Sequence, residues 1–463
     1  MNDAPPMRST FTRRALLKGA AGASVSAVTF GLPGVTDAHT AWRQKPILPA
    51  ASYEAGIATA WFRLALQLVQ QTPGFSPPVT SRAFGYLGVA LYEALLPGMP
   101  GFQSLAGQLN ALPALPPPND HAYHWPSVAN AALAASTRAL FPTASDANQA
   151  AINALETRFA SSLADGLPPG IVRRSGARGQ TVAAHIIEWS TTDGGHAGYL
   201  TNFPSDYVPP AGAGLWIPTP PGHQSALQPF WGQNRPFVLG SVAEVDPGPS
   251  PAFSTDPCSA FYREAMEVYQ TVEHLTEEQQ AIARFWSDDP GQTATPPGHS
   301  LAILTQVLEE READLAMAAE AYAKTGMAVA DAFISCWHTK YRYHLLRPIS
   351  YIQAYIDPGW GVGDHALPLV TPPFPEYTSG HSVQTAGFAQ VLFDLFGDFP
   401  FTDHTHDERG LAPRSFTSCF AMAEEAAISR LYGGIHFRSA IDRGVEQGNQ
   451  IGKRVGALRF RRT

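Results

Sequence analysis

Charged side chains, cysteines and long apolar runs are all scarce in this chain of 463 residues. Asp, Glu, Lys and Arg make up 15% of it and the formal net charge is −8, which argues against a nucleic-acid partner or an anionic membrane surface. No run of about 20 apolar residues is present, so stable membrane insertion is not expected. The three cysteines, Cys258, Cys336 and Cys419, form no Cys-x-x-Cys pair. Structural zinc on cysteine is therefore excluded, and free buried cysteines are favoured.

Strictly alternating runs of β-branched residues are scarce as well, whereas apolar residues recur at helical spacing. The sequence predicts a mainly α fold built of two helical bundles. The expected helices cover residues 52–71, 79–96, 125–140, 147–163, 171–190, 259–269, 276–286, 300–324, 327–346, 381–396, 413–432 and 441–460.

Proline is abundant, with 41 residues, and it concentrates between the two sets of helices. Residues 203–257 interleave prolines with Trp216, Phe230, Trp231 and Phe237, and a disordered linker would be poorer in aromatics. We expect an ordered crossing loop, which divides an N-terminal helical domain (39–202) from a C-terminal bundle (258–463).

The N-terminal 38 residues are typical of a twin-arginine export signal. Thr12-Arg-Arg-Ala-Leu-Leu-Lys18 precedes a weakly apolar stretch, Gly19–Leu32, which is too short to span a bilayer. We expect cleavage near Ala38 and a periplasmic or secreted protein.

The last third of the chain carries three segments that suit one tetrahedral oxyanion. In the first, the spacing of Trp337, Lys340, His344 and Arg347 places them on one face of a predicted helix that ends at Pro348. Lys340 and Arg347 would lie roughly 10 Å apart along the axis, so that both side chains can converge on one anion. A solvated charged stripe is the alternative.

The second segment, Ser379-Gly380-His381, stands where a helix begins. Free backbone N–H groups and the helix dipole favour an anion there, and Gly380 permits close approach. The alternative is a simple serine cap.

The third segment is Ser429-Arg430 followed by His436. The pair Gly433-Gly434 breaks the helix, which allows His436 to turn back to the same site. The alternative for His436 is a buried histidine without a catalytic task.

Together, Lys-x6-Arg-Pro, Ser-Gly-His and Ser-Arg-x5-His resemble the signature shared by vanadium-dependent haloperoxidases and type 2 phosphatidic-acid phosphatases. The resemblance implies a vanadate cofactor coordinated by His436, with His381 as general acid/base. It further implies vanadate oxygens held by Lys340, Arg347, Ser379, Gly380 and Arg430. The block Phe285-Trp-Ser-Asp-Asp289 extends the likeness upstream and implies that Asp289, or its rival Asp288, orients Arg430 through a salt bridge.

Two positions depart from the family pattern. Thr378 replaces the usual proline before Ser379, and Ala440 replaces the carboxylate expected four residues after His436. Two alternatives follow: Asp442, the nearest acidic residue, orients the histidine instead, or this role is absent.

The same cradle serves haloperoxidation and phosphoryl transfer, because vanadate resembles the five-coordinate state of phosphorus. We favour oxidation of bromide or chloride by hydrogen peroxide, since Trp337 and Phe374 stand where relatives have a halide-pocket Trp and Phe. A secreted acid phosphatase with His436 as nucleophile is the second choice, and a lapsed phosphate-binding site the third.

Some features leave alternatives open. Asp403-His-Thr-His-Asp-Glu408 suits either a solvated polar loop or a metal cluster. The sequence does not identify an organic acceptor, and a homodimer is one option for the oligomeric state.

Overall fold

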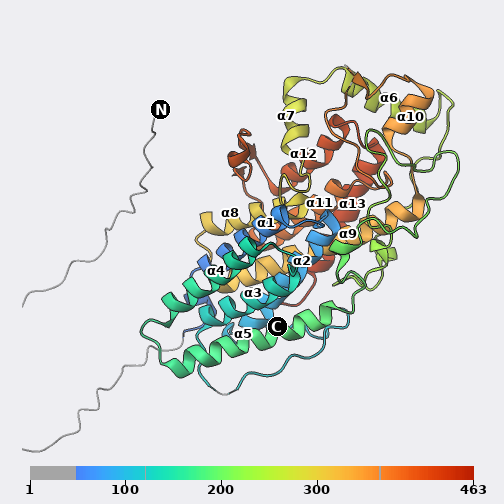
Figure 1. Ribbon diagram of the computed structural model, residues 1–463. Helices are drawn as coiled ribbons and strands as arrows, with labels where there is room; N and C mark the ends of the chain where they lie inside the picture. Colours follow the sequence, from blue (N-terminus) through green and yellow to red (C-terminus); the bar gives the residue numbers. More distant parts are fainter. Residues whose placement is uncertain (1–47, 120, 364–365, 463) are drawn as a thin grey trace, which may run out of the picture. The chain divides into compact units, whose positions relative to one another are not determined.

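The computed structural model describes residues 48–119, 121–363 and 366–462, so the predicted export signal lies outside the described residues. These residues belong to one compact unit, Gln44–Thr463. The mainly α prediction is confirmed (Figure 1). The α-helices are α1 (Gly56–Gln71), α2 (Pro77–Leu95), α3 (Trp125–Leu140), α4 (Asp146–Ala164), α5 (Pro169–Ser190), α6 (Ala260–Glu273), α7 (Glu277–Phe285), α8 (Thr295–Glu310), α9 (Leu315–Tyr343), α10 (Pro348–Tyr355), α11 (Gly380–Phe396), α12 (Cys419–Tyr432) and α13 (Arg438–Gly456).

Helices α1 to α5 pack together in the N-terminal half, where α3 lies against α2, α4 and α5 (Figure 1). Nearly every residue of α2 is buried because this helix is apolar on all sides and lies between α3 and α9. Its start is set by Pro77 and Pro78, since proline is tolerated in the first helical turn.

The 29-residue helix α9 joins the two halves, because it packs against α2 on one side and α11 on another. The crossing with α2 is close enough to require glycine: a Cβ on Gly326 would lie 2.5 Å from the Phe84 carbonyl oxygen. The two bundles predicted from the sequence therefore share α9 and one continuous core.

Helices α11, α12 and α13 form the C-terminal bundle with the end of α9. A two-stranded antiparallel hairpin, β1 (Phe401–Asp403) and β2 (Arg414–Phe416), joins α11 to α12 with Thr402 paired to Ser415. Ser418 caps α12 by accepting a hydrogen bond from the Ala421 amide, which fixes its start after the hairpin.

Residues 203–257 have defined positions, as expected of an ordered crossing loop. Trp216, Trp231 and Phe237 are buried, whereas Phe230 is 43% exposed and does not anchor the loop. Buried Asp331 of α9 accepts hydrogen bonds from three consecutive loop amides, those of Phe237, Val238 and Leu239. The loop is thus fastened to the helix that carries Lys340.

Several predicted boundaries are wrong. The break expected near residue 325 lies at residues 311–314, where Asp314 caps α9. Residues 414–416 form β2 and not the start of a helix, and α10 was not predicted. Cys258, Cys336 and Cys419 are free, and all but the exposed Cys258 are buried. In the described part, no helix is long and apolar enough to cross a membrane.

Candidate active site

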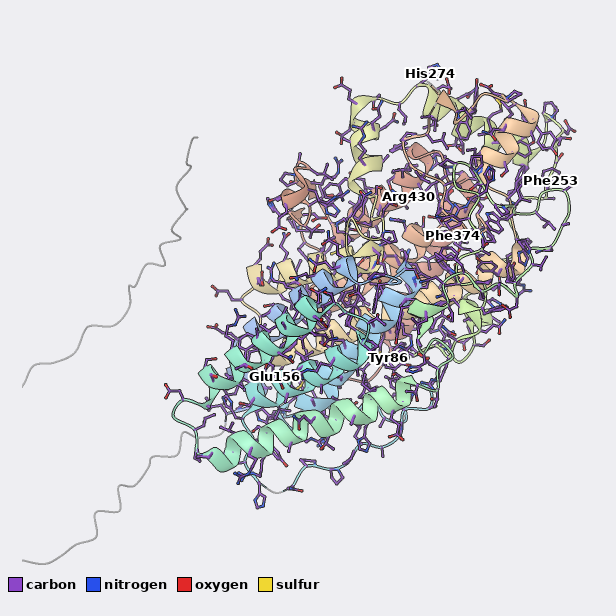
Figure 2. The ribbon with its side chains drawn as sticks, viewed as in Figure 1. Tyr86, Glu156, Phe253, His274, Phe374 and Arg430 are labelled. Carbon is purple, nitrogen blue, oxygen red and sulfur yellow. The ribbon has the colours of Figure 1, made fainter. Side chains whose placement is uncertain are left out.

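A cavity of about 690 Å³ opens between the two bundles and is mostly apolar at its walls. Polar groups from the second and third predicted segments line it: Gly380, His381, Arg430 and His436. Trp337 and Phe374 line it too. Arg430 of α12 and Phe374 of the loop before α11 are labelled in Figure 2. This volume suits a small ligand.

Lys340 and Arg347 lie directly behind the cavity wall and are completely buried. The prediction that they share a helix face is wrong, because α9 ends at Tyr343 and His344 takes a left-handed conformation. Arg347 caps α10, and Pro348 begins that helix. His344 faces away from the cavity and contacts Tyr207. The chain reversal at His344, and not a shared helix, brings the two cations together.

The hydrogen bonds of these two cations differ. Lys340 Nζ donates to the carbonyl oxygens of Pro375, Glu376 and Thr378 at 2.6–3.0 Å. Arg347 donates to the carbonyls of Phe374 and Ile435, and its Nη2 is buried with no partner among the described residues. Burial lowers the pKa of Lys340 to about 7 and that of Arg347 to about 10.

His436 is held in one tautomer by a carboxylate that the sequence analysis missed. Its Nδ1 lies 2.7 Å from Oε1 of Glu376, which also accepts the Phe437 amide at 2.9 Å. Because Oε1 is already an acceptor, Nδ1 is the donor and Nε2 keeps its lone pair. Nε2 lies 3.3 Å from Arg347 Nη1. Burial and the nearby Arg347 lower the pKa of His436 well below its usual value, so the imidazole is neutral.

Glu376 therefore takes the place of the carboxylate missing at Ala440. The Ala440 carbonyl instead accepts the Ser379 amide, and Asp442 is exposed on the other side of α13. Glu376 stands in the Pro-rich loop before Ser379. The only signal for it in the sequence was an acidic residue within the segment that leads into Ser379-Gly380-His381. Burial raises the pKa of Glu376 to about 8, against the opposing effect of Arg347 and Lys340.

The second segment begins α11 as predicted. Ser379 caps the helix by accepting the Ser382 amide at 3.3 Å, and Gly380 and His381 form the first turn. His381 Nε2 is buried and has no hydrogen-bond partner in the described part of the chain. Burial and Arg430 lower the pKa of His381 well below its usual value, so its ring is a neutral proton acceptor.

Arg430 is oriented by main-chain and hydroxyl groups. Its Nη2 donates to the Trp286 carbonyl at 2.8 Å and its Nε to Ser429 Oγ at 3.0 Å. The expected salt bridge to Asp289 or Asp288 is wrong: among the described residues, neither carboxylate pairs with Arg430. Both aspartates still raise the pKa of Arg430 through space, although burial outweighs them and lowers it to about 10.

Thr378 is held firmly despite replacing proline. Its hydroxyl donates to Gln447 Oε1 at 2.8 Å and its carbonyl accepts a hydrogen bond from Lys340. Trp337 and Phe374 pack with ring centroids 4.8 Å apart, and the Trp337 indole N–H donates to the Leu227 carbonyl. The wall therefore presents ring atoms to the cavity and not this N–H group.

Comparison with solved structures places the chain in a family. A bacterial vanadium-dependent iodoperoxidase is 38% identical, with a TM-score of 0.79, and the match covers 89% of this chain and 97% of that one. This chain belongs to the vanadium-dependent haloperoxidase family. Residues 320–461 also match the family model for the VCPO second helical-bundle domain. A bacterial vanadium-dependent chloroperoxidase is 17% identical with a TM-score of 0.65 over 84% of this chain and 93% of that one, which shows a shared fold. No curated protein sequence matches.

The residues of this haloperoxidase-family site fit vanadate. Burial lowers the pKa values of three cations, Lys340, Arg347 and Arg430, and the acidic groups around them only partly offset this effect. Among the described residues, Arg347 Nη2 and His381 Nε2 are buried without partners, and the lone pair of His436 Nε2 accepts only the long hydrogen bond from Arg347 Nη1, at 3.3 Å. A tetrahedral oxyanion supplies the missing charge and acceptors.

Proposed function

We propose that the protein is a vanadate-dependent haloperoxidase that uses hydrogen peroxide to oxidise halide to a hypohalous species. The observation that carries this proposal is the state of His436. Glu376 fixes its Nδ1 proton, so that Nε2 is a neutral ligand beside three buried cations. Family membership and the 38% identical iodoperoxidase support the same chemistry.

Each polar group of the cavity receives a task in this proposal. Bound vanadate supplies a Lewis acid that polarises peroxide without a redox change at the metal. His436 is its ligand, and Arg347, Arg430, Ser379 and the Gly380 amide hold its oxygens. Lys340 adds positive charge from behind the wall. His381 is neutral and takes the proton released when peroxide binds.

The halide pocket is the apolar wall beside these groups. Phe374 lies over two cations, 5.0 Å from Lys340 Nζ and 4.8 Å from Arg347 Cζ. This arrangement strips water from a halide while keeping it near positive charge. The sequence favours bromide or chloride, whereas the relative is described as an iodoperoxidase and iodide is the halide most easily oxidised. Iodide is therefore assayed first, followed by bromide and chloride.

The decisive experiment compares two reactions of the purified protein. With orthovanadate, peroxide and each halide, halogenation of an activated diketone is expected. The vanadate-free protein is assayed in parallel with p-nitrophenyl phosphate, because His436 Nε2 would also serve as a phosphatase nucleophile. Phosphate-ester hydrolysis without vanadate-dependent halogenation would establish the phosphatase alternative.

Two variants test the roles of the histidines. His436→Ala should abolish vanadate binding, measured by equilibrium dialysis. His381→Ala should keep vanadate bound but lower turnover by about 10²–10⁴-fold, because it removes a proton acceptor and no ligand. Retained vanadate binding in His436→Ala contradicts the ligand assignment.

Export and assembly remain predictions. We propose that residues 1–38 direct twin-arginine export, which is tested by replacing Arg13-Arg14 with Lys-Lys and following a fused reporter into the periplasm. A homodimer is tested by light scattering of the purified protein.

A further inference from the structure

Behind the cavity lies a cluster of four buried side chains that the proposed function does not use. Asp288 lies between α7 and α8, His299 in α8, Asp403 at the end of β1 and His406 just after it. Each is at most 5% exposed. Three chain segments that are distant in sequence thus bring two imidazoles and two carboxylates together in the interior.

The nitrogen and oxygen atoms of the cluster lie close enough together to surround one ion. His299 Nδ1 lies 2.9 Å from Asp288 Oδ2, and His299 Nε2 lies 2.8 Å from Asp403 Oδ2. His406 Nε2 faces Asp288 Oδ1 at 3.4 Å, too far for a good hydrogen bond, and neither atom has another partner in the described part of the chain. One ligand atom from each of Asp288, His299 and His406 falls within 4.8 Å of the others.

We propose that Asp288, His299 and His406 bind a divalent transition-metal cation, for which zinc is the best match, and that Asp403 positions His299. Two imidazole nitrogens and one carboxylate form a typical three-ligand protein set for zinc. The arrangement of Asp403 matches a recurrent feature of such sites, in which a carboxylate accepts the second ring N–H of a metal-binding histidine. Asp403 is itself fixed, because its Oδ1 accepts the Thr405 amide at 2.8 Å.

Charge and hydrogen bonding both favour a cation here. Two buried carboxylates with neutral imidazoles leave two negative charges in the interior, which is costly unless they are paired or coordinate a metal. A cation among the three ligands also engages Asp288 Oδ1 and His406 Nε2, which otherwise remain unpaired.

The rival occupant is a single proton. Burial lowers the pKa of His299, but Asp288 and Asp403 outweigh it and raise the pKa to about 10, so a protonated His299 between two carboxylates also balances charge. In that arrangement the His406 ring only packs against His299 and Phe285, with ring centroids 4.3 and 5.0 Å away. The two hypotheses therefore differ in whether His406 binds a metal.

A metal here would act on the wall of the active-site cavity. Ser287, Asp288 and Asp289 line that cavity, and the Trp286 carbonyl orients Arg430. Binding would fasten this segment to the loop after β1, so metal loading should raise thermal stability whether or not vanadate is present.

The test uses the full chain without an affinity tag, stripped with a chelator and free of vanadate. After incubation with zinc and gel filtration, elemental analysis should give about one zinc per chain, and the melting temperature should rise. His406→Ala should lose both effects. The matched control is His404→Ala, since His404 sits on the same loop with a side chain that is 50% exposed and paired with Asp407. Asp403→Asn should lower zinc affinity about 10–100-fold.

Zinc binding that is absent in the wild type, or equal in His406→Ala and His404→Ala, overturns the proposal and leaves the protonated His299. If His406→Ala fails to fold, X-ray absorption at the zinc edge of the loaded wild-type protein decides. Two imidazole ligands support the site, and a spectrum without imidazole rejects it.

Discussion

Glu376 sets the chemical state of His436, and it does so from a loop and not from the helix that follows the histidine. Glu376 Oε1 accepts both the imidazole Nδ1–H and the Phe437 amide, so the ring cannot turn without leaving its own buried N–H group unpaired. The single N–H···O bond therefore fixes both the tautomer and the direction of the Nε2 lone pair, which faces Arg347 Nη1 at 3.3 Å.

Above the raised pKa of Glu376, about 8, where the carboxyl is ionised, Glu376→Gln should lower the preference of the site for vanadate over sulfate by about 10–100-fold. Glutamine keeps an acceptor for His436 and Phe437 but removes the charge that makes the imidazole a strong ligand. Loss of that negative charge favours both anions alike, so the ratio of their dissociation constants isolates the effect on the histidine. Asp442→Asn is the control, since Asp442 is exposed. An unchanged ratio in Glu376→Gln contradicts this role.

Sulfate binding to the vanadate-free protein should weaken as pH rises above about 7, where Lys340 loses its proton in the free protein. Burial lowers this pKa and a bound anion raises it, so binding above pH 7 must take up a proton, and affinity falls by up to about tenfold per pH unit. Sulfate keeps its charge over this range, which makes calorimetric titration at several pH values interpretable.

Lys340→Met supplies the comparison for this pH dependence. The variant should bind sulfate more weakly and should lose the change of slope near pH 7. The neighbouring Glu376, whose pKa is raised to about 8, remains as the source of any decline at higher pH. A change of slope at pH 7 that persists in Lys340→Met assigns the titration to another group.

Several residues of the candidate site were predictable because their type and spacing are specific, whereas their hydrogen-bond partners were not. His381, Arg430 and His436 line the cavity as expected. Glu376 was not predicted because its contact with His436 joins residues 60 positions apart. Asp289 was predicted to form a salt bridge with Arg430, but Arg430 donates to the Trp286 carbonyl instead. Partners of this kind are fixed by tertiary packing, which local sequence patterns do not encode.

At the scale of elements, the start of α11 is placed by its close packing on α13. The Ser379 amide donates to the Ala440 carbonyl, and glycines of α13 let the two backbones approach. A Cβ at Gly448 would lie 2.1 Å from the Val383 carbonyl oxygen, two residues beyond His381. The position of His381, the proposed proton acceptor, thus depends on a helix contact outside the cavity.

Gly448→Ala should destabilise the protein by about 1–3 kcal/mol and weaken sulfate binding, because the added methyl group forces α11 and α13 apart. Urea unfolding and calorimetry measure the two effects. Gly176→Ala in α5 is the matched control, since a Cβ there meets open space. It should stabilise the protein by about 0.4–1 kcal/mol and leave binding unchanged. Equal stability of the two variants would show that the contact tolerates a methyl group.

Helix positions were predictable from apolar periodicity, but two boundaries near the site were not. A break was predicted between residues 324 and 327, yet Gly326 lies within α9, where the nearby Phe84 carbonyl leaves no room for a side chain. The true break is marked by the Asp314 cap, a signal that the charged run around it obscured. The sequence also gave no sign that His344 would reverse the chain and carry Arg347 back toward Lys340.

At the scale of the molecule, α9 makes the two bundles interdependent. It packs on α2 in the N-terminal half and on α11 in the C-terminal half, and it carries Lys340 and Trp337 at its end. The crossing loop adds a second link, because Asp331 of α9 holds the amides of residues 237–239. A disturbance in the N-terminal half should therefore reach the active site.

Gly88→Ala tests this coupling at the crossing of α2 and α9, at a residue that does not line the cavity. A Cβ at Gly88 would lie 2.5 Å from the Tyr322 carbonyl oxygen, so α9 must shift, at a cost of about 1–3 kcal/mol. In the wild type, hydrogen exchange measured along a urea titration should show peptides of α3–α5 and of α11–α13 unfolding at the same urea midpoint. In the variant, the midpoints of both sets should fall to the same lower urea concentration. If only the midpoint of the α3–α5 peptides changes, the two bundles unfold independently and α9 unfolds with one of them.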